Sequence, residues 1–237
     1  MLFRKAILII HGFAGGTFDE EPLARFLELN NNFDVFMFTL PGHESVNRIK
    51  NKYTDWIDES EKQLEFLIDN GYKSIYVVGH SMGGVIATYL ATKYKEIKKL
   101  VLVAPAFKYF YDKDDKLISV IKKGNLLAKD YGYGTIAGRM IKASLSSVKE
   151  FMTLVREYNN TPKQVFIPTL IIQGLNDNVV PKSSGKYVYD NLMGMKCLVY
   201  VSGCTHDVFK GPKTDQINNI ISDFLKHNLL ENKVIEI

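Results

Sequence analysis

The chain has 237 residues, with 30 basic and 26 acidic side chains and a formal net charge of +4. With 46% hydrophobic and 24% charged residues it has the composition of an ordinary globular protein, which excludes a fibrous or disordered chain. The basic residues are scattered, so we expect a solvated surface and no nucleic-acid-binding patch. Length and even composition favour one domain.

Membrane and redox signals are weak. Apolar runs stay well short of the ~18 residues of a transmembrane helix, and the N-terminal apolar stretch after Lys5 ends at His11, without a signal-peptide cleavage pattern. Cys197 and Cys204 form neither a disulfide framework nor a CxxC site. We therefore expect a cytoplasmic protein without stable membrane insertion, either a monomer or a homodimer.

The first predicted elements alternate between strand and helix. Residues 6–10 are a continuous apolar run, which predicts a strand covered on both faces. The glycine-rich stretch 11–16 follows, and then a helical pattern over 17–30 that opens with an acidic turn, as helix N-termini prefer. A second apolar run at 34–38 completes a strand, helix, strand unit.

The same alternation continues toward the middle of the chain. A helical pattern over 51–70 precedes a strand at 74–78, and a second one over 81–94 precedes a strand at 99–104. Such alternation predicts an α/β fold. We expect a mostly parallel central sheet of about six to seven strands with helices on both faces.

Alternation fails over residues 106–168. A structureless loop of that length is improbable in a compact domain, so we expect an inserted helical subdomain there, with the core formed by 1–105 and 169–237. The insertion follows the carboxyl end of a strand, where open α/β sheets place ligand sites, so we interpret it as a cap over a pocket. Packing onto the sheet edge is the alternative.

After the insertion the strand and helix patterns resume. The predicted strands are 169–173 and 196–201, and the predicted helices are 182–192 and 214–230.

The segment Gly79-His80-Ser81-Met82-Gly83 fits the pattern G-x-S-x-G between a predicted strand and a predicted helix. A strand that turns abruptly into a helix strains one residue and brings backbone segments close together, and the two glycines relieve those contacts. The turn presents the Ser81 hydroxyl at the carboxyl edge of the sheet, above the positive end of a helix dipole. Ser81 is therefore the candidate nucleophile.

A serine needs a base to become nucleophilic. His206 follows the last predicted strand in SGCTHD and emerges at the same edge as Ser81. Of the other histidines, His11 and His43 precede the serine in loops, His80 is its neighbour and should point elsewhere, and His227 lies in the last predicted helix. His206 is the candidate base.

The acid that orients the base should lie between them in chain order. Asp177 follows a predicted strand in GLNDNVVP, whereas Asp190 falls inside a helix and Asp207 adjoins the histidine. An Asx-type turn is the alternative role for Asp177.

An acyl-transfer site also needs donors for the oxyanion. The backbone N–H of Met82 follows the nucleophile, and the loop HGFAGG offers the N–H of Phe13. Alone, that loop could be a phosphate cradle, but it lacks the GxGxxG spacing and the lysine of a P-loop.

These signals occur in the order shown by the α/β-hydrolase superfamily, which the chain resembles over nearly its whole length. The short N-terminus and the single insertion make it similar to small bacterial carboxylesterases and monoacylglycerol lipases. Two departures are visible: Pro41-Gly42-His43-Glu44-Ser45 where many relatives have G-H-G, and SGCTH where some have SGH.

The resemblance implies hydrolysis of a small carboxylic ester through an acyl-enzyme, with no metal or organic cofactor. The aromatic and aliphatic residues of the insertion and its surroundings predict an apolar acyl site, formed by Phe107, Phe110, Phe151, Val155 and Val179. Serine at position 81 conflicts with reactions that use an aspartate nucleophile. Thioester, amide or peptide, and carbon–carbon bond hydrolysis stay open, as does a non-catalytic ligand-binding protein of the same fold.

Overall fold

The computed structural model describes residues 5–30, 33–44, 50–111, 114, 116–119, 122, 136–141, 143–227 and 231–237. Within these residues seven strands form a sheet in the order β2-β1-β3-β4-β5-β6-β7, and every neighbouring pair is parallel. The strands are β1 (Lys5–Ile10), β2 (Phe33–Met37), β3 (Ile75–His80), β4 (Ile97–Val103), β5 (Thr169–Gly174), β6 (Lys196–Val201) and β7 (Lys233–Glu236).

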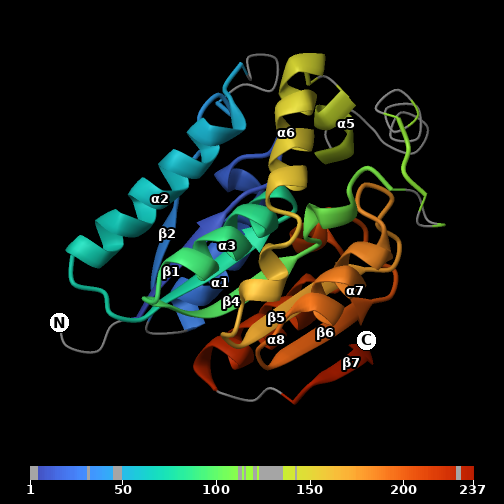
Figure 1. Ribbon diagram of the computed structural model, residues 1–237. Coiled ribbons are helices and arrows are strands. Elements are labelled where there is room, and N and C mark those ends of the chain that lie inside the picture. Colours follow the sequence, from blue (N-terminus) through green and yellow to red (C-terminus); the bar gives the residue numbers. More distant parts are fainter. Residues whose placement is uncertain are drawn as a thin grey trace.

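Helices connect the strands and cover both faces of the sheet (Figure 1). They are α1 (Thr17–Asn30), α2 (Tyr53–Asp69), α3 (Met82–Lys93), α5 (Ile136–Ile141), α6 (Leu145–Glu157), α7 (Lys182–Asn191) and α8 (Thr214–Lys226), with short 3₁₀ turns η2 (Ala106–Lys108), η3 (Thr161–Gln164) and η4 (Val208–Lys210). The α/β fold and the mostly parallel sheet predicted from the sequence are confirmed.

Two hydrophobic cores lie on opposite faces of the sheet. Along β1, Leu8 and Ile10 belong to the core under α2, α3 and α7. Ile7 and Ile9 belong to the core under α1 and α8. Successive strand residues point to opposite faces, so a strand buried on both faces must be apolar throughout, which explains its continuous rather than alternating pattern.

Outside the insertion, the predicted element bounds agree closely with the structure as far as β6. The helix predicted at 51–70 is α2, and Gly71 follows it with a φ of 91°, the left-handed conformation that ends many helices. The helix predicted at 214–230 ends at Lys226, and residues 228–230 lie outside the described part. Strand β7 was not among the predicted runs, because KVIE is short, mostly exposed and charged at both ends.

The predicted insertion at 106–168 is described only in part, since 112–113, 115, 120–121, 123–135 and 142 lie outside the described residues. Its described portion contains η2, α5, α6 and η3. Helix α6, in the segment where a helical subdomain is predicted, packs against α2 and α3 and extends past the sheet in Figure 1.

None of the described helices combines the length and apolar character needed to cross a membrane.

Candidate active site

The strand-to-helix turn at Ser81 has the strained geometry that its glycines predict. Ser81 has φ 54° and ψ −116°, outside the usual regions for a residue with a side chain. A Cβ at Gly79 would lie 2.3 Å from the Gly83 carbonyl oxygen, and one at Gly83 would lie 2.1 Å from the Ile10 carbonyl oxygen. Only glycine fits at either position. The strained backbone of Ser81 costs on the order of 1–3 kcal/mol, which the surrounding packing must offset.

His206 and Asp177 meet at the carboxyl edge of the sheet. His206 Nδ1 lies 2.8 Å from Asp177 Oδ2, and both side chains are fully buried. A carboxylate can only accept, so we assign the ring proton to Nδ1, which leaves Nε2 of the neutral ring as an acceptor. This is the orientation that a general base requires.

Asp177 also forms the Asx-type turn that we considered as its alternative role. Its Oδ1 accepts hydrogen bonds from the N–H groups of Val179 and Val180, each at 2.8 Å. Gln173 Nε2 donates to Oδ2 at 3.2 Å. One oxygen thus orders the loop while the other binds His206, so the two interpretations are compatible.

Ser81 and His206 are enclosed in this conformation. Both residues are 0% exposed. Ser81 Oγ and His206 Nε2 are both buried and have no hydrogen-bond partner among the described residues. The hydroxyl-to-imidazole hydrogen bond is therefore not made here, as is common before a substrate binds.

The loop after β1 lies directly against Ser81. A Cβ at Gly12 would come within 2.9 Å of Ser81 Cβ. Phe13, whose N–H we predicted as an oxyanion donor, is the next residue and is buried, as is Met82 at the first position of α3. Phe13 thus follows Gly12, which lies against Ser81, and Met82 follows Ser81 itself.

Two of the other histidines order loops at this edge. His11 Nδ1 donates to the Gly12 carbonyl at 2.8 Å, and Nε2 accepts from the Leu40 N–H at 3.0 Å, which joins the loops after β1 and β2. Burial lowers the pKa of His11 to about 4 and that of His43 to about 3, so both are neutral at pH 7.

His80 points away from Ser81, as expected, and binds a buried carboxylate. Its Nδ1 lies 2.7 Å from Glu20 Oε1, and its Nε2 lies 3.2 Å from the carbonyl oxygen of His206. Since both neighbours are acceptors, the doubly protonated ring suits both contacts. Burial is the largest single influence and lowers the pKa of His80, but the hydrogen bond to Glu20 and the negative charges of Glu20, Asp19 and Asp177 together outweigh it and raise the pKa above 6.5.

Sequence reasoning missed the partners of the acidic turn at the start of α1. Asp19 is buried and accepts from Arg139 Nη2 of α5 at 2.5 Å and from Lys210 Nζ of η4 at 2.8 Å. Asp19 and Glu20 were interpreted only as a helix N-terminus signal. Two buried carboxylates in succession cannot be recognised from their spacing, because their partners come from segments far away in the chain.

Aromatic side chains cover the loop after β1. The Phe151 ring of α6 stacks on Phe13 with centroids 5.0 Å apart, and Tyr109 and Phe110 contact Phe151 at 4.9 Å and 5.8 Å. The five residues predicted to form an apolar acyl site all belong to the core on this face of the sheet, namely Phe107, Phe110, Phe151, Val155 and Val179.

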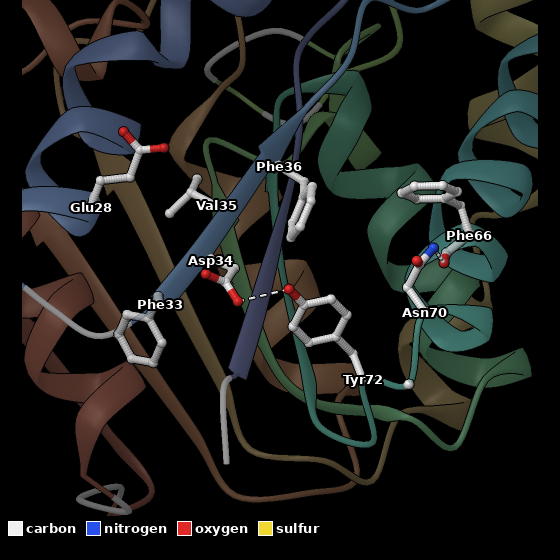
Figure 2. A pocket seen from close by; sticks show the side chains of 9 residues that line it. Glu28, Phe33, Asp34, Val35, Phe36, Phe66, Asn70 and Tyr72 are labelled. Atoms are coloured by element: carbon white, nitrogen blue, oxygen red, sulfur yellow. Dashed lines mark hydrogen bonds between the residues drawn. The ribbon is translucent and has the colours of Figure 1, made fainter. Parts of the chain in front are cut away.

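A groove of about 580 Å³ lies elsewhere, along the outer edge of β2 between α1 and α2 (Figure 2). Its lining includes Phe33, Phe36 and Phe66, and the Tyr72 hydroxyl donates to Asp34 at 2.7 Å. The three predicted catalytic residues are not part of its lining.

Comparison with known proteins identifies the family. Residues 5–124, just over half of the chain, match the family model described as the alpha/beta hydrolase fold. The chain belongs to the α/β-hydrolase fold family. The match spans the loop after β1, the turn at Ser81 and the start of the insertion.

Individual relatives are more distant. The chain is 23% identical to a carboxylesterase of Bacillus subtilis over 94% of its length and 92% of that protein's. Its fold is similar to that of a metagenome-derived lipolytic enzyme, with a TM-score of 0.76 at 19% identity and 94% coverage of both chains. The monoacylglycerol lipase of Paleococcus ferrophilus has a TM-score of 0.70 at 18% identity, with 93% of both chains covered.

Proposed function

We propose that this α/β-hydrolase cleaves carboxylic esters, with Ser81 as nucleophile, His206 as general base and Asp177 as the acid that orients the base. The observation that carries the proposal is the 2.8 Å contact between His206 and Asp177 at the sheet edge where the strained turn presents Ser81. The esterase and lipase functions of the relatives described above support the same reaction class.

In the proposed mechanism, Ser81 Oγ attacks the ester carbonyl while His206 Nε2 takes its proton. The Asp177 carboxylate holds the imidazole and stabilises its cation. The N–H groups of Phe13 and Met82 stabilise the tetrahedral oxyanion, and one such donor typically contributes ~3 to 4 kcal/mol to barrier lowering. His206 then protonates the leaving alcohol, and a water activated by the same nitrogen cleaves the acyl-enzyme.

We propose that the substrate is a short- to medium-chain acyl ester or a monoacylglycerol. The fully buried Phe151 ring stacks on Phe13, the proposed oxyanion donor, and the Tyr109 and Phe110 rings pack against Phe151. An acyl chain that enters between these rings replaces one apolar contact by another. On this proposal residues 106–168 act as the cap of a cytoplasmic enzyme.

The decisive experiment combines a serine-directed phosphonate with a panel of chromogenic esters of increasing acyl length. We expect labelling of the wild type, no labelling of Ser81→Ala, and greater activity on medium-chain esters than on acetyl esters. Absence of labelling, or equal labelling of Ser81→Ala, would rule out the hydrolase. Highest activity on acetyl esters or charged peptides would rule out the apolar acyl site.

Asp177→Asn tests the role of the acid with little damage to the loop. The asparagine oxygen can still accept from the N–H groups of Val179 and Val180, but its NH₂ group cannot accept a hydrogen bond from His206 Nδ1–H. We expect kcat to fall on the order of 10⁴-fold with little loss of stability. Asp190→Asn, which removes an exposed carboxylate on α7 paired with Lys186, is the matched control.

A further inference from the structure

Asp19 connects three segments that surround the proposed active site. Its carboxylate, at the N-terminal end of α1, accepts from Arg139 Nη2 and from Lys210 Nζ. Arg139 belongs to α5 in the insertion, and Lys210 follows His206 by four residues. The Asp19 side chain is only 3% exposed, so its burial requires a cationic partner, and this is not an optional surface pair.

Arg139 also binds the loop after β1 directly. Its Nε donates to the carbonyl oxygen of Ala14 at 3.0 Å. Ala14 has φ 57°, a left-handed conformation that a residue with a Cβ rarely adopts without outside support. Ala14 follows Phe13, whose N–H is the proposed oxyanion donor. The arginine therefore supports the one strained residue of the segment that must present that donor.

The guanidinium is itself held in place. Its central carbon lies 5.0 Å from the centroid of the Phe18 ring, and Lys210 Nζ lies 5.7 Å from the same centroid. The Arg139 side chain is 14% exposed. The planar guanidinium is fixed by a ring, a carboxylate and a carbonyl. Because its donors bind two acceptors at once, it holds the Ala14 carbonyl at a fixed place relative to Asp19.

We propose that Arg139 is a positioning residue for the oxyanion loop: by binding Asp19 and the Ala14 carbonyl together, it keeps the Phe13 N–H in its productive place and couples that place to the insertion. The inference rests on the proposed ester hydrolysis. Arg139 donates to neither Ser81 Oγ nor His206 Nε2, so its removal should impair the chemical step through the loop rather than through substrate binding.

Kinetics of Arg139→Gln and Arg139→Lys test this role. Asp19 keeps Lys210 in Arg139→Gln, so no buried charge is orphaned and the variant should fold. We expect kcat for a chromogenic butanoate ester to fall about 10- to 100-fold, because small displacements of a positioned group have effects of that size. KM should change less than about threefold. Arg139→Lys should be intermediate, since one ammonium cannot span both acceptors.

Arg156→Gln is the matched control. Arg156 lies on α6, is exposed and pairs with the exposed Glu157, so its loss removes the same charge from the same insertion. We expect wild-type kinetics from it. A kcat for Arg139→Gln equal to that of Arg156→Gln would overturn the proposal.

Hydrogen exchange supplies a readout that does not depend on catalysis. In Arg139→Gln the amides of residues 12–16 should exchange about tenfold faster than in the wild type, while Arg156→Gln leaves them unchanged. A lower kcat without faster exchange would overturn the proposal, because Arg139 would then act by some route other than the loop. Faster exchange in a protein whose wild type neither hydrolyses esters nor reacts with the phosphonate would support the loop contact and refute the proposed function.

Discussion

At the scale of single residues, the informative side chains are those with two contacts. Asp177 orders its own loop through one oxygen and His206 through the other. His80 binds Glu20 through one nitrogen and the His206 backbone through the other. The His206 loop is thus held from two sides, which favours a fixed imidazole position over a mobile one.

The buried pair of Glu20 and His80 predicts a pH-dependent contribution to stability. The pKa of His80 is raised above its ordinary 6.5, so the folded protein keeps a proton that the unfolded chain releases. The contribution is therefore fully present below pH 6.5 and is lost as pH rises through the folded pKa. Its size is about 1.4 kcal/mol for each unit by which the folded pKa exceeds the unfolded value.

Glu20→Gln should remove this contribution, because burial without the carboxylate lowers the pKa of His80. Urea unfolding at a series of pH values from about 6 to 9 should show the wild-type advantage over Glu20→Gln shrinking as pH rises. Glu21→Gln, next to Glu20 in the sequence, breaks only an exposed ion pair with Arg25 and should show no such trend. A wild-type advantage that is constant or grows with pH would contradict the prediction.

The sequence was sufficient to locate Ser81, Asp177 and His206 at one edge of the sheet, because each follows an apolar run and parallel strands end together. It was insufficient for Glu20 and Arg139. Glu20 contacts His80, which is 60 residues away in the sequence, and Arg139 contacts Asp19, which is 120 residues away. A charged residue at a helix start has the same local pattern whether it faces water or a buried partner.

At the scale of elements, the strands and helices that form the core were predictable because burial on both faces demands continuous apolar runs. Strand β7 was not, since it lies at the sheet edge and needs only one partner, β6. The end of α8 also escaped prediction, as its C-terminus is set by a residue of another element.

That residue is Lys99 of β4, whose ammonium donates to the carbonyl oxygens of Phe224, Leu225 and His227 at 2.8, 3.1 and 2.9 Å. These carbonyls terminate α8, where the helix dipole favours a cation. Burial lowers the pKa of Lys99 to about 8, so the side chain is still mostly protonated at pH 7. The buried Lys99 in β4 therefore has a structural role, because it binds the carbonyl groups at the end of α8.

Lys99→Met should destabilise the protein by about 2 kcal/mol, because it leaves carbonyls at the end of α8 without their donor. Lys98→Met is the matched control: Lys98 is exposed, donates among the described residues only to the Lys95 carbonyl, and should change stability by less than about 0.5 kcal/mol. Chemical unfolding at pH 7 measures both. Equal stability of the two variants, or a gain in Lys99→Met, would show that the buried charge costs as much as its hydrogen bonds contribute.

At the scale of the whole molecule, the structure is closed over the residues that we propose to be catalytic. Ser81 and His206 are both 0% exposed, and Phe151 of α6 is 0% exposed in its stack on Phe13. A substrate carbonyl cannot reach Ser81 Oγ unless the side chains that enclose Ser81 move. The cap over residues 106–168 stays a prediction, and the sequence could not predict the full burial of Phe151 against Phe13.

If opening limits access, its rate and population should depend on Phe151. Reaction with a phosphonate is slowed by the fraction of molecules that are closed, and a bulky phosphonate needs a wider opening than a small one. Phe151→Ala removes the stacked ring and should raise the ratio of bulky to small phosphonate labelling rates about tenfold. Leu145→Ala on the same helix, where the side chain is exposed, should keep the wild-type ratio.

The ratio is the required measurement because Phe151→Ala has two further effects. Truncating a fully buried phenylalanine costs ~3 to 5 kcal/mol, so labelling must be done where circular dichroism shows the variant folded. Loss of the stack on Phe13 also slows both probes if it disturbs the oxyanion loop, and that effect cancels in the ratio. An unchanged ratio in Phe151→Ala would mean that access to Ser81 depends on a route that avoids α6.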